Sequence, residues 1–302
     1  MPTIGGAVGS DAALTIAAAI AIAFALGGLV IFIAPVFGAN KKTSVHLRSL
    51  FFAQVLIVAA VAVPTYVGGW VLTLALGIFL ARGLFELADI FPTAKTPRSI
   101  LIYIYYGVSA AFPTLLNLSQ SNWHGLMWTG ILLPFFWVHQ TRQNRLELAI
   151  SLVFFVTCIE AILFLAFQSN GFLLIVFVYF LVETFDAFAF ICGSLWGRTK
   201  IFPRLSPNKT LEGYLGGFVA ALGAGTLLNI FVYKFEPMKL ITIMSVILIA
   251  GIFGDFLASL VKRRKGVKDF AALHSLHGGL LDIYDSYLAA SLAFAGLILL
   301  MS

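Results

Sequence analysis

The sequence predicts an all-α polytopic membrane protein, a bundle of about ten transmembrane helices with nine as the alternative. Of its 302 residues, 61% are hydrophobic and only 11% are charged, and the mean hydropathy is +1.01. A soluble domain could not bury that much apolar surface, so soluble enzymes are excluded. Apolar segments of roughly spanning length recur at 12–36, 50–64, 66–82, 99–118, 123–139, 147–168, 171–196, 213–233, 239–261 and 279–301.

The first segment is expected to be a retained span, because the first 40 residues contain no Lys or Arg and so lack the basic start of a cleavable signal peptide. The segments 50–64 and 66–82 are short and predict a hairpin that turns between Pro64 and Gly69. From residue 171 onward the polar residues gather near helix ends. This divides the chain into N-terminal spans (1–168) and a second transmembrane region (169–302), in which the candidate functional residues are sought.

The positions of the basic residues test this count of membrane spans. With ten spans, 17 of the 19 Lys and Arg residues fall on one side of the membrane, and only Lys234 and Lys239 fall on the other. The positive-inside rule makes the first side cytoplasmic, and we expect a bacterial cytoplasmic membrane. Such a basic face attracts lipid headgroups or a polyanionic nucleotide. Because no nucleic-acid-binding motif accompanies it, no nucleic acid is expected as a partner.

A cluster near the C-terminus suggests phosphoryl chemistry. Asp282 and Asp285 are three residues apart at the start of the last span and so share one helix face. They follow His277-Gly278-Gly279, a turn whose helix N-terminus would offer backbone N–H groups to phosphate. Carboxylates of this kind hold Mg²⁺ together with substrate phosphates. The alternative is that an Asp in the first turn only caps the helix.

The preceding span carries a polar stripe. Asp255, Ser259, Lys262 and Arg263 are spaced at i, i+4, i+7 and i+8, which places them on one side of a helix. Asp255 lies about two turns inside the apolar segment, where a carboxylate needs a partner or a metal.

A second constellation begins on the span 171–196 with Glu183 and Asp186. The loop that follows contains Ser206, Lys209 and Thr210, and three nearby glycines (Gly213, Gly216 and Gly217) are expected to let backbone approach a ligand. The GxxxxGK[ST] spacing of a Walker site is absent.

Three other carboxylates lie in the N-terminal spans. Glu86 and Asp89 could bind a cation, but a hydrated helix end is favoured. Glu160 lies inside a span, and two interpretations are equally favoured: a hydrogen-bonded carboxyl between helices, or a functional group. Cys158 and Cys192 lie in apolar spans and predict neither a disulfide nor a zinc site.

These motifs resemble the signature of the phosphatidate cytidylyltransferases, in which S-x-hydrophobic-K-R is followed after four residues by K-D and then by H-G-G-x-x-D-R-x-D. The sequence matches it at Ser259, Val261, Lys262, Arg263, Lys268, Asp269, Ala271, His277, Gly278, Gly279, Asp282 and Asp285. Upstream, Asp186 with Ala189 and Phe190, and the run SPNKTLEGYLGG, are similar to further segments of that family. The specific resemblance covers residues 183–290.

The resemblance implies transfer of a cytidylyl group from CTP to phosphatidate in phospholipid biosynthesis, with Mg²⁺ as cofactor, and it allows K⁺ beside the Mg²⁺. It implies membrane lipids as surroundings and allows a homodimer. Asp255, Asp282 and Asp285 would hold the metal, with Lys262 and Lys268 as further catalytic residues. The implied substrate-binding residues are Ser206, Lys209, Thr210, Glu212, Ser259, Arg263, Asp269, His277 and Asp186.

One departure from the pattern is Ile283, which stands where the family has Arg. Arg264 and His274 are the residues that could replace the missing charge. The departure also leaves open a diverged paralogue that acts on another lipid phosphate. A CTP-dependent kinase of a membrane lipid alcohol is the other enzymatic alternative. A secondary transporter is disfavoured because no repeat is visible, and a CDP-alcohol phosphotransferase because its DGxxAR motif is missing.

Overall fold

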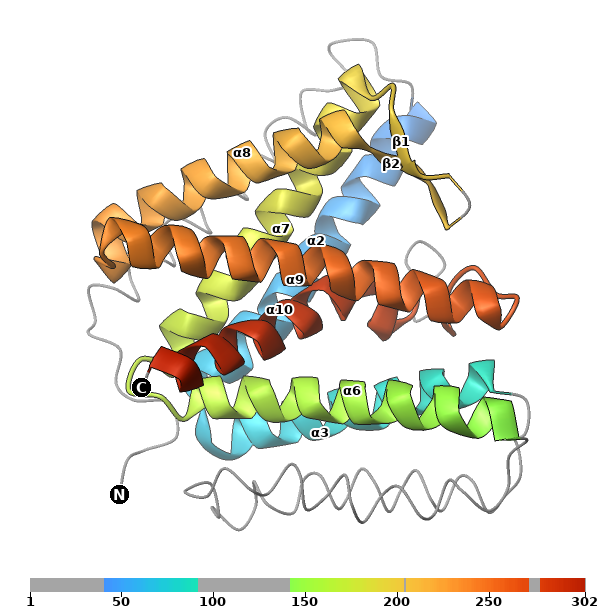
Figure 1. Ribbon diagram of the computed structural model, residues 1–302, viewed down its shortest axis with the longest axis horizontal. Helices are drawn as coiled ribbons and strands as arrows, with labels where there is room; N and C mark the ends of the chain where they lie inside the picture. The colour runs from blue at the N-terminus through green and yellow to red at the C-terminus, as the bar shows by residue number, and fades with distance from the viewer. Residues whose placement is uncertain (1–40, 92–141, 204, 272–277, 302) are drawn as a thin grey trace.

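The computed structural model describes residues 41–91, 142–203, 205–271 and 278–301 (Figure 1). Within these ranges, α-helices dominate, and a short β-hairpin and one π-helical turn accompany them. The elements in chain order are α2 (Lys41–Val67), α3 (Gly69–Ile90), α6 (Arg142–Ala166), α7 (Gly171–Trp196), β1 (Lys200–Phe202), β2 (Ser206–Thr210), α8 (Leu211–Leu228), η2 (Asn229–Tyr233), α9 (Pro237–Arg264) and α10 (Leu280–Met301).

Five segments of the described chain are helical, long and apolar enough to cross a membrane: Gly69–Leu87, Gly171–Trp196, Leu211–Tyr233, Pro237–Arg264 and Leu280–Met301. Helices α2 and α6 carry the shorter apolar stretches Phe51–Val67 and Ile150–Ala166. The predicted spans 12–36, 99–118 and 123–139 lie outside the described residues, so the count of about ten stays a prediction. The all-α class needs one correction, because β1 and β2 pair as an antiparallel hairpin.

The predicted hairpin of segments 50–64 and 66–82 corresponds to α2 and α3. The chain reverses at Gly68 and Gly69, which have φ angles of 65° and 53°. These left-handed values favour glycine. Pro64 lies inside α2 rather than in the turn.

The helices run back and forth between two ends of the bundle (Figure 1). At one end, Lys265 Nζ lies 2.5 Å from Glu147 Oε2 of α6, and Arg263 Nε donates to the carbonyl of Leu205 beside the hairpin at 3.3 Å. At the other end, Tyr233 Oη donates to the carbonyl of Leu173 at 2.8 Å. The described basic residues gather at the first end, whereas Lys234 directly follows η2 and Lys239 lies in the first turn of α9, at the second end (Figure 1). The predicted segregation of charge is confirmed for this part of the chain.

Helices α7 and α8 pack backbone to backbone through small residues. Gly213, Gly217, Ala221 and Gly225 recur every four residues on α8 and are all buried. A Cβ added to Gly213 would lie 2.6 Å from the carbonyl oxygen of Ala189. Such close contact between helices in lipid requires small residues. Gly213, Gly216 and Gly217 therefore face α7. The expectation that these three glycines let backbone approach a ligand is wrong.

Helix α9 crosses α10 at another glycine. A Cβ on Gly254 would lie 2.6 Å from the carbonyl oxygen of Asp285 and 2.4 Å from Cβ of Ala289. Only a glycine permits this distance. The crossing brings Asp255, the next residue of α9, to the turn of α10 that carries Asp285.

Candidate active site

Two lysine–aspartate ion pairs among the described residues join the polar elements at the basic end. Lys209 of β2 pairs with Asp255 of α9, and Lys262 of α9 pairs with Asp282 of α10. The side chains of the second pair are only 10% and 11% exposed. Removing charges from water is costly unless each has a partner, so these contacts fix the positions of the four side chains. The polar stripe predicted on the span 239–261 therefore faces the hairpin and α10.

Asp282 is also bound to backbone. Its Oδ2 accepts hydrogen bonds from the N–H of Gly279 at 2.7 Å and from the N–H of Phe270 at 2.8 Å. Lys262 Nζ lies 5.3 Å from the centre of the Phe270 ring. Asp282 thus links Phe270, which follows α9, to Gly279 at the start of α10. The capping alternative describes part of its role.

Asp285 and Asp186 complete the charge cluster. Asp285 Oδ1 accepts the N–H of Ser286 at 2.6 Å and is half-buried. Both carboxylates lie within electrostatic reach of Lys209. Burial lowers the pKa of the Lys209 ammonium, and the negative charges of Asp186 and Asp285 oppose that shift. The cluster therefore combines lysines that can neutralise phosphate with carboxylates that can bind a cation.

Glu86 of α3 contradicts the prediction of a hydrated helix end. Its residue is 0% exposed, and its two oxygens accept the N–H groups of Leu280 at 2.8 Å and Leu281 at 2.9 Å. Arg82 Nε donates to Glu86 Oε1 at 2.8 Å. The first N–H groups of α10, expected to be available to phosphate, are bonded to protein carboxylates instead. The two partners are 194 residues apart in sequence, so no local pattern could reveal this contact.

Two residues predicted to bind substrate also hold the hairpin in place. Thr210 is 2% exposed, and its Oγ1 accepts the N–H of Gly213 at 3.2 Å as the N-cap of α8. Glu212 accepts the N–H of Arg198 at 3.0 Å and the hydroxyl of Thr199 at 2.8 Å. Both interactions order the connection between α7 and α8 around Lys209.

The remaining predicted residues lie on α9, in the hairpin and in the loop after α9. Ser259 is half-buried on α9 between Asp255 and Lys262, and Ser206 pairs with Phe202 in the hairpin. Arg263 donates to the carbonyls of Leu205 and Val267. Lys268 and Asp269 are exposed in the loop after α9. His277 lies outside the described residues, as does His274.

Arg264 pairs with a carboxylate of α6. Its Nη1 lies 3.6 Å from Glu147 Oε1 of α6, and its side chain is 59% exposed. Ile283 packs against the hydrophobic core. The cation beside Asp282 is Lys262, which comes from the other helix.

The expected three-carboxylate magnesium site is not assembled in this geometry. Among the described residues, no three His, Cys, Asp or Glu side chains form a group that could hold a metal. Asp255 and Asp282 are each bonded to a lysine, and Asp285 is bonded to Ser286. Mg²⁺ usually takes one or two protein carboxylates and fills its other positions with water and phosphate oxygens. The donor set fits a metal that arrives with a nucleotide.

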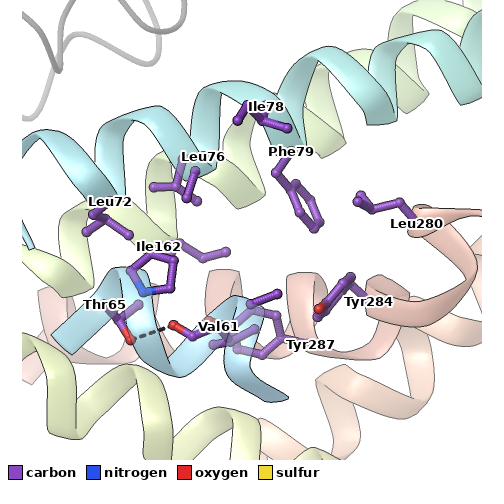
Figure 2. Close-up of a pocket in the computed structure, with 13 residues that line it drawn as sticks. Val61, Thr65, Leu72, Leu76, Ile78, Phe79, Ile162, Leu280, Tyr284 and Tyr287 are labelled. Atoms are coloured by element: carbon purple, nitrogen blue, oxygen red, sulfur yellow. Dashed lines mark hydrogen bonds between the residues drawn. The ribbon is translucent and has the colours of Figure 1, made fainter. Parts of the chain in front are cut away.

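Two apolar cavities lie within the bundle and extend to the start of α10 or to Asp285. The larger has a volume of about 330 Å³ and lies between α2, α3, α6 and α10, with Leu280, Tyr284 and Tyr287 on its α10 side (Figure 2). Tyr284 Oη donates to the carbonyl of Ile57 at 3.0 Å. A second cavity of about 150 Å³ is lined by apolar residues of α6 and α9 and by Asp285. Apolar space next to a charged cluster suits a substrate with a phosphate head and a hydrocarbon tail.

Comparison with known proteins decides the family. The family model described as the cytidylyltransferase family matches residues 47–301. The chain belongs to the cytidylyltransferase family. The match includes every described element of the polar cluster.

Individual relatives of this cytidylyltransferase agree with that assignment. The chain is 27% identical over 224 residues to the phosphatidate cytidylyltransferase of Aquifex aeolicus, an alignment that covers 74% of this chain and 85% of the relative. It is 38% identical over 122 residues to the phosphatidate cytidylyltransferase of Staphylococcus saprophyticus, covering 40% of this chain and 47% of the relative. It is also 36% identical over 126 residues to the uncharacterized protein YnbB of Escherichia coli, covering 42% of each. The chain thus spans about half the length of the staphylococcal relative.

Proposed function

We propose that this cytidylyltransferase transfers the cytidylyl group of CTP to phosphatidate, giving CDP-diacylglycerol and pyrophosphate. The observation that carries the proposal is the pairing of Lys209 with Asp255 and of Lys262 with Asp282 at one end of a membrane bundle. Lysines next to carboxylates suit a nucleotide that brings both phosphate charge and a divalent cation.

In the proposed reaction, an oxygen of the lipid phosphate attacks the α-phosphorus of CTP. The bond from that phosphorus to the bridging oxygen of the β-phosphate breaks, and pyrophosphate leaves with the electron pair. Both reactants are anions, so the protein has to bring them together and neutralise their charge. Lys209 and Lys262 are the groups for this task, and each would exchange its aspartate for a phosphate oxygen when substrate binds.

Mg²⁺ would be held by Asp285 together with Asp255 or Asp282 after their lysines turn to substrate. When bound, the ion would neutralise charge that develops on the phosphate oxygens. A potassium ion beside it belongs to the same proposal. Ser259, on the turn of α9 between Asp255 and Lys262, would donate its hydroxyl to a phosphate oxygen.

The hydrocarbon tails of phosphatidate would remain in the apolar part of the bundle. The cavity of about 150 Å³ reaches Asp285, and the cavity in Figure 2 reaches Leu280 at the start of α10. Their apolar walls support a lipid acceptor rather than a soluble one. The basic end would face the cytoplasm, where CTP is available, in the cytoplasmic membrane of a bacterium. A homodimer is compatible with this arrangement.

Labelled CTP tests the proposal directly. Purified protein in detergent is incubated with Mg²⁺, with CTP labelled at either the α- or the γ-phosphate, and with phosphatidate, a different lipid phosphate or a lipid alcohol in parallel reactions. We expect label from the α-phosphate to enter the lipid fraction and label from the γ-phosphate to appear in pyrophosphate. Transfer of γ-label to a lipid alcohol would indicate a kinase, and activity on a different lipid phosphate would indicate another acceptor.

A further inference from the structure

Helix α3 supplies a buried contact to the start of α10. Glu86 accepts both the N–H of Leu280 and the N–H of Leu281, at 2.8 and 2.9 Å, and has no exposed surface. The N-terminus of a helix carries partial positive charge, so a carboxylate there is stabilising as a charge and as a double acceptor. The first turn of α10, which contains Asp282, is therefore fixed by a residue of a different helix.

Arg82 extends the contact to the loop before α10. Its Nε donates to Glu86 at 2.8 Å, and its Nη2 donates to the carbonyl of Ala271 at 2.7 Å. Arg82 thus neutralises the buried carboxylate and holds the end of the segment that follows Phe270. Phe270 itself donates its N–H to Asp282. Asp282 is then held on two sides, by its own helix start and by the loop.

The fit at Gly279 indicates a tight contact. A Cβ at this position would lie 2.4 Å from Glu86 Oε2 and 2.6 Å from Cβ of Phe270. Only glycine leaves room for the carboxylate to reach the N–H groups of the next two residues. The same glycine donates its N–H to Asp282 Oδ2 at 2.7 Å. Glu86 and Asp282 therefore bind adjacent backbone groups of one turn.

From these contacts we infer that Glu86 and Arg82 are positioning residues for the cytidylyl transfer, which hold Asp282 and Asp285 in register with Lys262. The inference assigns neither side chain a role in binding the substrate. The inference rests on the proposed function for its kinetic part, whereas the contact itself can be measured without activity. A shift of about 1 Å in a catalytic group costs on the order of 100-fold in rate, so a fixed helix start matters for the reaction.

The test compares Glu86→Gln with Glu147→Gln in purified full-length protein. Glu147 is a matched control, because it is also a carboxylate that bridges helices at the same end, and its ion pairs join α6 to Arg264 and Lys265 at the end of α9. Hydrogen exchange followed by mass spectrometry reports on the N–H groups of Leu280 and Leu281. Steady-state kinetics with CTP, phosphatidate and Mg²⁺ reports on turnover.

For Glu86→Gln we expect exchange at Leu280 and Leu281 to accelerate about tenfold or more, because hydrogen bonds to a charged acceptor are lost. We expect kcat to fall roughly 10- to 100-fold while KM for CTP changes less than about threefold, because Lys209 is undisturbed. Glu86→Asp, which keeps the charge on a shorter side chain, should recover part of kcat. Glu147→Gln should change neither quantity.

Gly279→Ala provides an independent approach from the opposite side of the contact. It should reproduce the loss of kcat, and in the Glu86→Gln background it should add little, because both variants disturb one contact. Unchanged exchange at Leu280 and Leu281 in Glu86→Gln would overturn the inference. A normal kcat despite faster exchange at these two residues would also overturn it. A loss of kcat with faster exchange in all helices would overturn it too, because the variant would then have destabilised the whole protein. If the wild-type protein transfers no cytidylyl group, the proposed function fails, and the exchange data still decide whether Glu86 holds α10.

Discussion

Lys209 of the β-hairpin and Asp255 of α9 form an ion pair that fastens the connection between α7 and α8 to the centre of the polar cluster. Lys209 follows Ser206 on a strand of only five residues, and Thr210 then caps α8. The hairpin is thus a short arm that presents one lysine to α9. Its other end is tied by Arg263 to the carbonyl of Leu205.

Replacing Lys209 with Ala should weaken the use of CTP. Loss of a charged hydrogen bond to phosphate costs about 1.5–3 kcal/mol, which corresponds to roughly 10- to 100-fold in kcat/KM. Lys200→Ala is the control, because Lys200 is an exposed lysine of the same hairpin. The measurement is kcat/KM for CTP at fixed phosphatidate. Equal losses in the two variants would mean that the hairpin contributes only general positive charge.

Lys262 and Asp282 should be coupled in stability. Lys262→Met leaves a nearly buried carboxylate without its cation, and Asp282→Asn removes the partner from a nearly buried ammonium. Each should lower stability by about 1–3 kcal/mol, and the double variant should lose less than the sum. Thermal unfolding in detergent gives the three shifts in Tm. Strict additivity would show that the two groups do not interact in solution.

Asp285→Asn should raise the Mg²⁺ concentration that gives half-maximal turnover, by about tenfold or more if the carboxylate is a direct ligand. Chelation of the metal with EDTA should abolish turnover of the wild type. Glu236→Gln is a suitable control, because Glu236 is an exposed carboxylate at the start of α9, at the opposite end of the bundle. An unchanged Mg²⁺ dependence in Asp285→Asn would exclude this residue from the metal site.

Membrane topology can be tested with single cysteines in a background in which Cys158 and Cys192 are replaced by Ala. Lys200→Cys in the hairpin and Lys239→Cys in α9 lie at opposite ends of the bundle, and both positions are exposed. An impermeant thiol reagent added to intact cells should label only Lys239→Cys if the basic end is cytoplasmic. Labelling of Lys200→Cys alone would reverse the orientation.

Arg264→Ala should leave turnover within about twofold of the wild type. Its partner is Glu147 of α6, and an exposed ion pair contributes about 0–1 kcal/mol. The same turnover assay measures this. A tenfold or greater loss of turnover would indicate that Arg264 supplies the positive charge that the family has as Arg at the position of Ile283.

Much of the polar cluster follows from sequence spacing. Asp255, Ser259 and Lys262 share a helix face wherever the helix lies, because a period of 3.6 residues is a local property. Asp282 and Asp285 share a face for the same reason. The family resemblance then joins these residues to the hairpin lysine. Lys209 and Asp255 are 46 positions apart in the sequence, and nothing in the spacing indicates that they form an ion pair.

The errors have physical causes. Glycines and a threonine beside Lys209 were expected at a ligand, but α8 uses the glycines to pack against α7 and Thr210 as its cap. Small residues serve close helix packing and close ligand approach equally well, and sequence does not distinguish the two. Glu86 was expected in water because its neighbours place it near a helix end. Its burial depends on α10, which is encoded almost 200 residues later.

The sequence by itself determined the membrane class, the apolar segments, the basic end and the helix faces that carry the acidic residues, because hydropathy and helical period depend only on neighbouring residues. The tertiary structure alone decided which charges meet: Lys209 with Asp255, Lys262 with Asp282, and Glu86 with the start of α10. These contacts depend on where helices cross, and the crossings depend on side-chain volume at glycines such as Gly254, where one added carbon would push α9 and α10 apart.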